Sequence, residues 1–247
     1  MAFDNRSRDG KFQIMNHPRN LEYQVLVGQS KTQLELFAES LGEQSYRGRQ
    51  LFDWLYHQKN DIIDEMTDLP VLFREQVKKS AIVHPLVQVT QSDSGSKQTK
   101  KFLFQLQDGN QIESVLMKEK DRTTICISTQ VGCAVNCDFC ATAAMGFIQN
   151  LSAGEIVDQF LQLKKFSSGP ITNVVFMGMG EPLLNYKNVI AAADLLHDPD
   201  GINMGAKRIT ISTAGIIPKI KQFTAEAHKY KLAISLNGST QEQRLRT

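Results

Sequence analysis

Two spacings of hydrophobic residues divide the chain. Between Ser30 and about residue 81, apolar residues recur every three or four positions, as in helices with one buried face. We expect the first helix to begin at Ser30 and to stop at Gly42. Ser45 is expected to cap the second helix, and Pro70 stands where a third would begin. These elements predict a small helical module near the N-terminus.

Beyond residue 83 the hydrophobic residues alternate with polar ones, which predicts strands. The expected strands are residues 83–89, 100–107, 111–117, 123–128, 171–177, 208–212 and 232–236. Helices are expected from Ser152, whose spacing to Glu155 is that of a capping box, through Leu163, from about Lys187 to His197, and from Pro218 to Tyr230. From residue 123 onward, strands and helices therefore take turns.

This alternation predicts an α/β fold in which helices cover a parallel sheet, either open or part of a barrel. Parallel strands end at the same edge of the sheet, so the loops that follow them lie close together. The loops after the last four strands hold the cysteine segment and three polar, glycine-rich segments, namely residues 178–182, 212–215 and 235–238. The sequence thus predicts a site at this rim.

Composition narrows the function classes only slightly. The chain has 247 residues, of which 41% are hydrophobic, and no apolar run is long enough to cross a bilayer. Its first residues lack the apolar segment of an export signal. A net charge of +2 is too small to indicate nucleic-acid binding unaided. Four cysteines, three of them within eight residues, favour a metal or redox site in a reducing compartment.

The three clustered cysteines are Cys133, Cys137 and Cys140, with the spacing Cys-x3-Cys-x2-Cys. Structural zinc normally takes four ligands in two pairs, whereas Cys126 lies upstream in an expected strand and the five histidines show no paired spacing. A [4Fe–4S] cluster fits better, because cysteine thiolates are its usual ligands and three of them leave one iron free for a small molecule. Zinc remains the alternative.

This cysteine spacing, followed by the Gly178-Met179-Gly180-Glu181 turn, resembles that of radical S-adenosylmethionine (SAM) enzymes, in which the free iron binds SAM. Longer segments resemble the RlmN/Cfr family of RNA adenine methyltransferases, and GEPLLNY favours its RlmN-type members. These segments are ISTQVGCAVNCDFCATAAMGFIQNLSAGEIVDQ, FMGMGEPLLNY, RITISTAGIIPKI and LAISLNGS. The resemblance extends from about residue 31 to the last residue.

The resemblance implies a partial (β/α)6 radical SAM barrel, incomplete in this chain, preceded by a small helical domain and a β-hairpin extension. The expected parts are a flexible tail (1–29), a helical accessory domain that binds RNA (30–81), the β-hairpin extension (82–122) and the radical SAM core (123–247). The resemblance also implies a cytoplasmic monomer without membrane association. Its implied partners are 23S rRNA, tRNA and an electron donor such as flavodoxin.

The implied reaction is methylation of C2 of one adenosine in the peptidyl-transferase centre of 23S rRNA and of the adenosine beside the tRNA anticodon. C2 lies between two ring nitrogens and is too electron-poor to attack the methyl group of SAM, so the methyl must arrive as a radical. In the family, a cysteine near the C-terminus first takes a methyl group from SAM, and a second SAM supplies the radical. Another cysteine then releases the product through a disulfide.

The resemblance assigns roles to eleven residues. They are Cys133, Cys137 and Cys140 as cluster ligands, Cys126 as the resolving cysteine, Glu113 as a proton acceptor, and Gly180, Glu181, Ser212, Ser235, Leu236 and Asn237 as SAM-contacting positions. Without the resemblance, Cys126 fits a buried strand cysteine and Glu113 a solvent-facing glutamate. Asn237 stands where some family members have histidine, so its side-chain contact is the least supported.

The sequence departs from the family in one respect. No cysteine follows Cys140, so the methyl-carrying cysteine has no counterpart here. We therefore expect a truncated family member that folds poorly alone and does not complete methyl transfer. Two other functions remain open, namely another radical SAM enzyme and a catalytically inactive iron–sulfur or zinc module that binds RNA.

Overall fold

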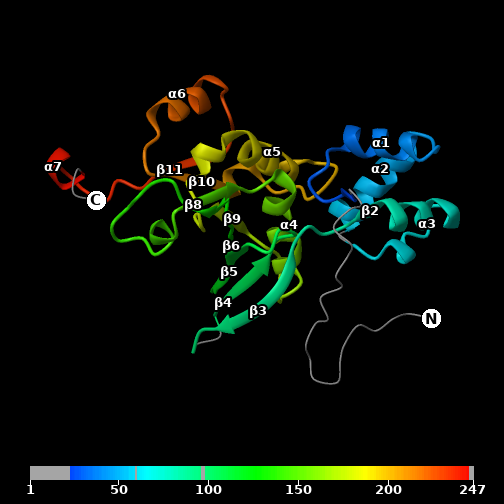
Figure 1. The fold of residues 1–247 in the computed structure, drawn as a ribbon, viewed down its shortest axis with the longest axis horizontal. Coiled ribbons are helices and arrows are strands. Elements are labelled where there is room, and N and C mark those ends of the chain that lie inside the picture. Colours follow the sequence, from blue (N-terminus) through cyan, green and yellow to red (C-terminus); the bar gives the residue numbers. More distant parts are fainter. Residues whose placement is uncertain (1–22, 59, 96–97, 245–247) are drawn as a thin grey trace.

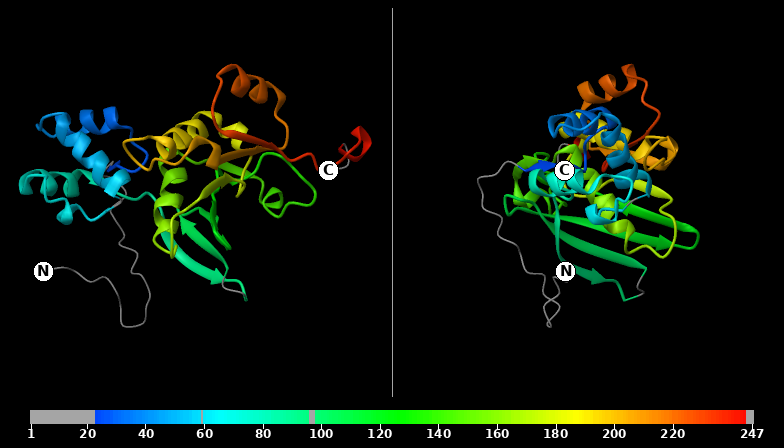
Figure 2. Two further views of the ribbon diagram at one scale, coloured as in Figure 1. Left: turned by 180° about the vertical axis from the view of Figure 1, so that it is seen from behind. Right: turned by 90° about the vertical axis from the view of Figure 1, so that its right-hand side faces the viewer.

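The computed structural model of the chain describes residues 23–58, 60–95 and 98–244. A helical module lies at one end of the molecule and the C-terminal elements lie at the other, with the main sheet between them (Figures 1 and 2). No helix in these ranges combines the length and the apolar character needed to cross a membrane.

The helical module contains α1 (Lys31–Ser40), α2 (Tyr46–Phe52) and α3 (Val71–Ser80), as the spacing predicted. Ser30 and Gln33 form a capping box at the start of α1, and Gly42 follows its end with a left-handed φ of 84°. The expected cap at Ser45 is wrong, because its side chain makes no capping hydrogen bond. Instead, α2 continues directly into a wider π-helical turn, Asp53–Gln58.

The interpretation of the first 29 residues as a flexible tail is wrong for the part that is described. Gln24–Val25 forms strand β1, which pairs in parallel with β2 (Ala81–Ile82), and the following Leu26 and Val27 are buried. Two buried apolar residues were too few to produce a periodic signal. Residues 1–22 lie outside the described residues.

The main sheet has seven strands in the order β11-β10-β9-β6-β5-β4-β3. Strands β6, β9, β10 and β11 are mutually parallel, and β3, β4 and β5 continue the sheet in antiparallel fashion. Their bounds are β3 (Val87–Asp93), β4 (Thr99–Gln105), β5 (Gln111–Glu119), β6 (Arg122–Cys126), β9 (Asn173–Phe176), β10 (Ile209–Thr213) and β11 (Lys231–Ile234). The expected hairpin extension is thus part of the same sheet as the α/β core.

Helices α4 (Ala153–Lys164), α5 (Tyr186–His197) and α6 (Ile217–Ala225) connect the parallel strands, and α7 (Gln241–Arg244) follows the last one. Alternate strand residues, such as Val174 and Ile211, are fully buried. Their neighbours Val175 and Ser212 are only partly buried and lie on the opposite, open face. This open, half-covered α/β sheet is the incomplete barrel that the sequence predicted.

Three element boundaries differ from the predictions. The strand expected from residue 83 begins only at Val87, because Pro85 lacks an N–H group for sheet pairing. The helix expected to reach Tyr230 ends at Ala225, and Ala227 then has a left-handed φ of 54°. The cysteine segment is enclosed by two short strands that the sequence did not predict, β7 (Gln130–Gly132) and β8 (Phe147–Asn150).

Candidate functional site

The loops that follow β6, β9, β10 and β11 all lie at one rim of the sheet, because these strands are parallel. The loop after β6 carries the cysteines between β7 and β8. The loop after β9 contains residues 178–182, and the loop after β10 contains residues 214–216. The predicted convergence of polar segments at one rim is therefore present in the structure.

Glu181 ties two of these loops together. Its side chain is buried, and its carboxylate accepts hydrogen bonds from the backbone N–H groups of Leu183, at 3.0 Å, and Ala214, at 2.7 Å. Its own N–H donates to Oε1 of Gln130 at 2.8 Å. Glu181 thus cross-links the segments after β9 and β10 to the strand that leads into the cysteine loop.

Glycine is required at two positions where backbones meet at the rim. Gly180 has a φ of 100°, and a Cβ there would lie 2.5 Å from the Cβ of Gln130. Gly132 has a φ of 71°, and its Cβ would lie 1.7 Å from the carbonyl oxygen of Gly146. A side chain at either position would separate the segments that form the rim.

Buried polar side chains that the sequence analysis missed hold the base of the cysteine loop. Gln130 donates to Oδ1 of Asn150 at 2.8 Å, joining β7 to β8. The amide of Asn185 donates to the carbonyl oxygens of Thr129 and Leu151 on either side of the loop. All of these donors are buried, and each is paired, as buried polar groups must be. The signal available in the sequence was a glutamine and an asparagine within otherwise apolar surroundings.

The three clustered cysteines lie on one loop, and all four cysteines of the chain are free thiols. The Cys140 N–H donates to the carbonyl oxygen of Cys137 at 3.2 Å, which makes a tight turn. Burial raises the pKa of Cys133 and of Cys137, and nearby negative charges, including Glu181 and Cys140, raise it further. Thiols that repel one another as thiolates are suited to bind a cation together.

The conclusion that the loop can bind a metal rests on the chemical type of its side chains and not on the positions of the sulfur atoms. Among the residues that the structure describes, no three His, Cys, Asp or Glu side chains are grouped closely enough to hold a metal ion. Three free thiols on a loop with a fixed base nevertheless match the ligands that iron–sulfur clusters take. The residues fit such a group by their chemistry.

Glu113 and Cys126 lie near each other on the open face of the sheet. Cys126 on β6 pairs with Val115 on β5, so Glu113, two residues from Val115, is a diagonal neighbour of Cys126 on the same face. The Glu113 carboxylate forms an ion pair of 2.8 Å with Lys101 and is about half exposed. Burial raises the pKa of Cys126 to about 11, so this residue is a neutral thiol near pH 7.

The remaining predicted positions lie along β10 and beyond β11. The hydroxyl of Ser212 donates to the carbonyl oxygen of Phe176 at 2.7 Å, and the Ser235 N–H donates to Thr213 at 2.9 Å. Leu236 is half exposed, and Asn237 has a left-handed φ of 52°. Ser212 and Ser235 are thus anchored to the neighbouring strand, while Leu236 and Asn237 extend past it.

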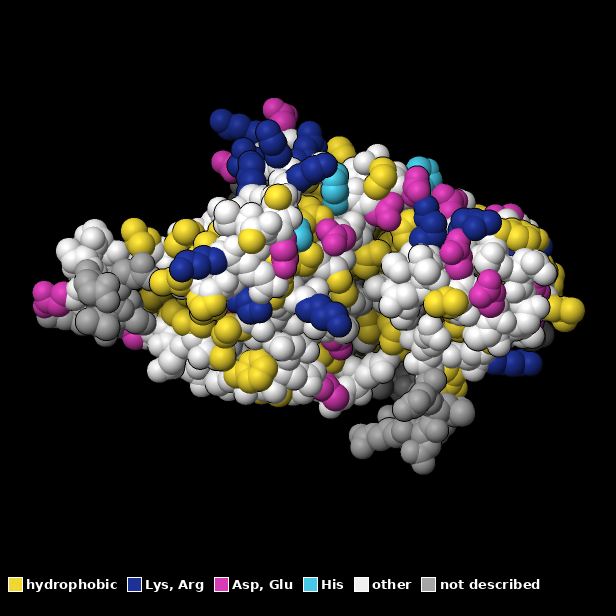
Figure 3. All heavy atoms as spheres, turned by 90° about the horizontal axis from the view of Figure 1, so that it is seen from above, with side chains coloured by type: hydrophobic (Ala, Val, Ile, Leu, Met, Phe, Trp, Pro, Cys, Tyr) yellow, Lys and Arg dark blue, Asp and Glu magenta, His cyan; other side chains and the backbone are white. Residues whose placement is uncertain are grey.

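Exposed hydrophobic side chains surround the rim. Figure 3 shows several groups of them toward the left end of the molecule, the end at which the cysteine loop and α7 lie in Figure 1. The large exposed residues in this region include Phe139, Met145, Phe147, Ile148, Met177 and Leu236. This end of the molecule offers apolar contact area beside the thiols.

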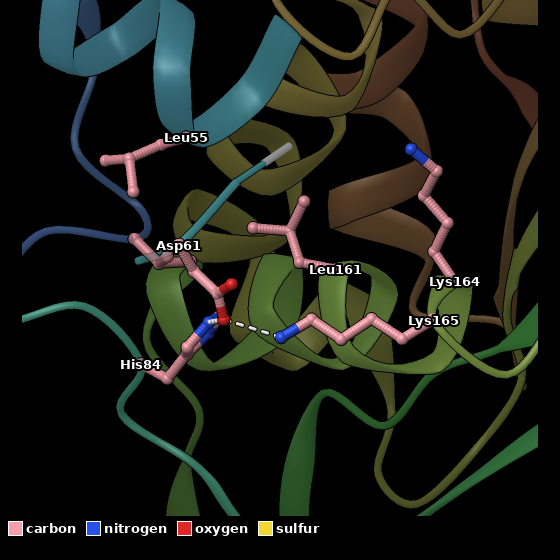
Figure 4. A pocket seen from close by; sticks show the side chains of 7 residues that line it. Leu55, Asp61, His84, Leu161, Lys164 and Lys165 are labelled. Carbon is pink, nitrogen blue, oxygen red and sulfur yellow. Dashed lines mark hydrogen bonds and ion pairs between the residues drawn. The ribbon is translucent and has the colours of Figure 1, made fainter. Parts of the chain in front are cut away.

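A second group of ionisable residues joins the helical module to the core, and the sequence analysis did not single it out. The His84 ring lies between two carboxylates: Nδ1 contacts Asp158, and Nε2 contacts Asp61 at 2.5 Å. Figure 4 shows His84 beside Asp61. Lys165 also reaches Asp61, at 2.5 Å, beside a pocket of about 100 Å³. Burial alone would lower the pKa of His84, but its hydrogen bonds to Asp158 and Asp61 raise it to about 9.

Two comparisons of sequence agree with this arrangement. Residues 25–83 match the family described as the ribosomal RNA large subunit methyltransferase N-terminal domain, and residues 127–247 match the radical SAM superfamily. The dual-specificity RNA methyltransferase RlmN of Geotalea uraniireducens is 42% identical over 212 residues, which are 86% of this chain and 61% of that protein. The probable dual-specificity RNA methyltransferase RlmN of a Thermotoga species (strain RQ2) is 46% identical over 212 residues, 85% of this chain and 62% of that protein.

A solved structure shares the fold. The radical SAM methyltransferase from Sphaerobacter thermophilus superposes with a TM-score of 0.85 at 40% identity, covering 90% of this chain and 66% of that one. The chain spans about six-tenths of the length of the curated relatives it matches. With both family matches in chain order and this degree of identity, the chain belongs to the RlmN/Cfr family of the radical SAM superfamily.

Proposed function

We propose that the protein containing this chain is a radical SAM methyltransferase that adds a methyl group to C2 of an adenosine in 23S rRNA and in tRNA. The observation that carries the proposal is the rim, where the loop with three free cysteines and the loops after β9, β10 and β11 meet. Residues 25–83 and 127–247 of the same chain match the two family descriptions. The names of the similar RNA methyltransferases support the same reaction.

In this proposal Cys133, Cys137 and Cys140 hold a [4Fe–4S] cluster with one iron left for SAM. When bound, the cluster and SAM supply radical chemistry that begins with reductive cleavage of the SAM sulfonium. The chain's own contribution is the fixed base of the loop, since Gln130 and Asn185 anchor both of its ends. A loop with a fixed base keeps the three thiols close to the rim.

The SAM-contacting positions divide into two roles. Gly180 and Glu181 shape the rim, because the Glu181 carboxylate is fully occupied by two backbone N–H groups and leaves the backbone of the turn to meet the ligand. Ser212, Ser235, Leu236 and Asn237 lie on the two outermost parallel strands and the loops that follow them. We assign them as the residues that would contact SAM from these two strands.

Glu113 and Cys126 are the proposed catalytic residues. The Lys101 ammonium lies 2.8 Å from the carboxylate of Glu113, and a carboxylate can accept a proton. Cys126 must lose its proton before it can attack a sulfur atom, and its raised pKa opposes this step until a base is near. Because Glu113 lies diagonally across from Cys126 on the same face of the sheet, we propose Glu113 as the base.

The wider assignments complete the proposal. Residues 30–81 form an RNA-binding accessory domain, residues 82–122 extend the sheet, and residues 123–247 form the radical SAM core. We propose rRNA and tRNA as substrates, an electron donor such as flavodoxin, and a monomeric protein in the cytoplasm.

Deleting the gene in its host tests the reaction. Digested 23S rRNA and tRNA should lose 2-methyladenosine, measured by mass spectrometry. The wild-type gene and an Ala144→Ser variant, changed at an exposed position of the same loop, should restore the signal. A Cys140→Ser variant should not. Persistence of 2-methyladenosine in the deletion strain would overturn the proposal and favour another radical SAM enzyme or a module that only binds RNA.

A further inference from the structure

The charge of this chain is distributed unevenly. Residues 207–231 contain six Lys and Arg residues and a single acidic residue, Glu226. The whole chain has 28 basic and 26 acidic residues, so the other 222 residues hold 22 against 25, a net charge of −3. A chain that is nearly neutral as a whole therefore carries one strongly basic segment.

The basic side chains of this segment are exposed on one surface. They come from the 3-10 turn Ala206–Arg208 before β10, from α6, from the loop between α6 and β11, and from the start of β11. Five of them are exposed, and we call these the basic patch: Lys207, Arg208, Lys221, Lys229 and Lys231. Figure 3 shows Lys and Arg side chains gathered along its upper left edge, the side on which α6 lies.

The positive charges of the basic patch are not neutralised by acidic side chains of the described residues. Among the described residues, none of its five side chains forms an ion pair. The carboxylate of Glu226 is already occupied by the Tyr186 hydroxyl, by Gln222 at 2.8 Å and by His228 at 2.7 Å. Five like charges repel one another unless an anionic partner covers them.

The position of the patch relative to the rim favours a nucleic acid over an acidic redox protein as its partner. Lys207 and Arg208 precede β10, whose five residues span about 15 Å before the rim is reached. A nucleic-acid duplex carries a charge roughly every 1.7 Å along its axis, so one that enters the rim offers phosphates over this whole distance. An acidic redox protein must instead bring its cofactor close to the cysteine loop, at the opposite ends of the strands.

We infer that the basic patch binds phosphates of the RNA substrate outside the rim. This inference rests on the proposed function and extends it. Phosphate contacts of this kind position an RNA without reading its bases. The patch therefore acts on affinity and orientation, and the choice of the target adenosine is left to the rim.

Binding of the full chain to tRNA over a series of KCl concentrations tests the inference. The patch variant carries Lys207→Gln, Lys221→Gln and Lys229→Gln. A matched control carries Lys118→Gln, Lys120→Gln and Arg122→Gln, which are exposed cations outside both the basic patch and the accessory domain. We expect the patch variant to raise Kd about tenfold near 150 mM salt and to reduce the slope of log K against log salt by about 2.

A third protein with Lys→Arg at the three patch positions keeps the charge and should bind as the unsubstituted chain does, which separates charge from folding. Equal weakening by the patch variant and the control would overturn the inference, because net charge alone would then explain the effect. Unchanged RNA binding with slower reduction by an acidic flavoprotein would also overturn it in favour of a protein partner. Loss of tRNA binding by the unsubstituted chain, together with persistent 2-methyladenosine in the deletion strain, would instead remove the proposed function itself.

Discussion

The contact around His84 and the loop around Cys137 both gather ionisable side chains, but they treat them in opposite ways. At His84, both ring nitrogens face carboxylates, and Asp158 receives further hydrogen bonds from the Leu86 N–H, at 3.1 Å, and from Gln162, at 2.9 Å. In the cysteine loop, the Val135 N–H lies 3.4 Å from Sγ of Cys133, and among the described residues no other backbone N–H is found to donate to the sulfur of Cys133, Cys137 or Cys140. One region is electrostatically complete, and the other leaves its donor atoms available.

This difference indicates what each region does. A buried group with every partner supplied by the chain stabilises the fold, and removing one partner leaves the others buried and unpaired. Partly exposed thiols that the chain itself hardly contacts contribute little to the fold and are available to a ligand. Substitutions in the first region should therefore change stability, and those in the second should change binding.

Asp158→Ala should cause the largest loss of stability. Asp158 is fully buried, and its removal leaves Nδ1 of His84 and the Leu86 N–H without their acceptor. We expect the free energy of unfolding to fall by about 3 kcal/mol or more, measured by urea denaturation. Asp64→Ala, which removes an exposed partner of Lys78, is the control and should leave the urea midpoint unchanged. Similar losses in both variants would contradict the comparison.

The pH dependence of stability follows from His84 and Asp61 in the same contact. The pKa of His84 is about 9 in the folded chain against an ordinary value of 6.5, so its contribution is complete below about pH 6.5 and is lost as the pH rises through 9. The hydrogen bond from His84 lowers the pKa of Asp61. The contribution of Asp61 to stability is therefore present above about pH 4 and is lost at more acidic pH. The cluster should stabilise the chain most between about pH 4 and 6.5.

We expect His84→Gln to lower the free energy of unfolding most at pH 6 and least at pH 9.5, with the two differences separated by at most about 3 kcal/mol. Urea denaturation of the unsubstituted chain and of the variant at the two pH values measures this. Titration of the cysteines affects both proteins equally and does not change the difference between them. His57→Gln, at an exposed histidine, serves as the control. A His84→Gln effect that is the same at pH 6 and 9.5 would show that the ring is not held as a cation.

Gly154→Ala should act on the same boundary through packing alone. A Cβ at Gly154 would lie 2.4 Å from the carbonyl oxygen of Val27, in the segment that leads to the helical module. Alanine favours a helix by up to about 1 kcal/mol, but the clash with backbone should outweigh this and leave a net loss of about 2 kcal/mol. Thermal unfolding measures the loss. At Gly169, where a Cβ would meet nothing within 4 Å, the same substitution should be nearly neutral.

The sequence predicted those elements whose signals are local. The capping box at Ser152 and the alternation along 111–117 identified α4 and β5, because each depends on residues within one turn or one strand. The position of the rim also followed from the order of strands and helices. Chain order is enough to bring the ends of parallel strands together.

The contacts that fix the site and the module depend on long separations, and no local pattern reports them. Asp158 meets His84 across 74 positions, and Glu181 meets Ala214 across 33. Gln130 and Asn185 are buried only because two loop strands and a neighbouring turn enclose them. A single sequence offers no means of pairing such residues, which is why the polar supports of the rim were missed.

The smallest effect on stability is expected for Cys137→Ser. Cys137 is partly exposed on a loop whose base is held by other residues, so the urea midpoint should change by less than the equivalent of about 0.5 kcal/mol. Iron and acid-labile sulfide per chain, measured after anaerobic reconstitution, should nevertheless fall sharply. Cys126→Ser is the matched control, because it changes the more buried strand cysteine outside the trio. It should lower stability more and keep the iron, so the two variants should exchange rank between the two measurements. Full iron retention by Cys137→Ser would contradict the distinction between the His84 contact, whose charged groups are paired within the chain, and the cysteine loop, whose sulfur atoms are available to a ligand.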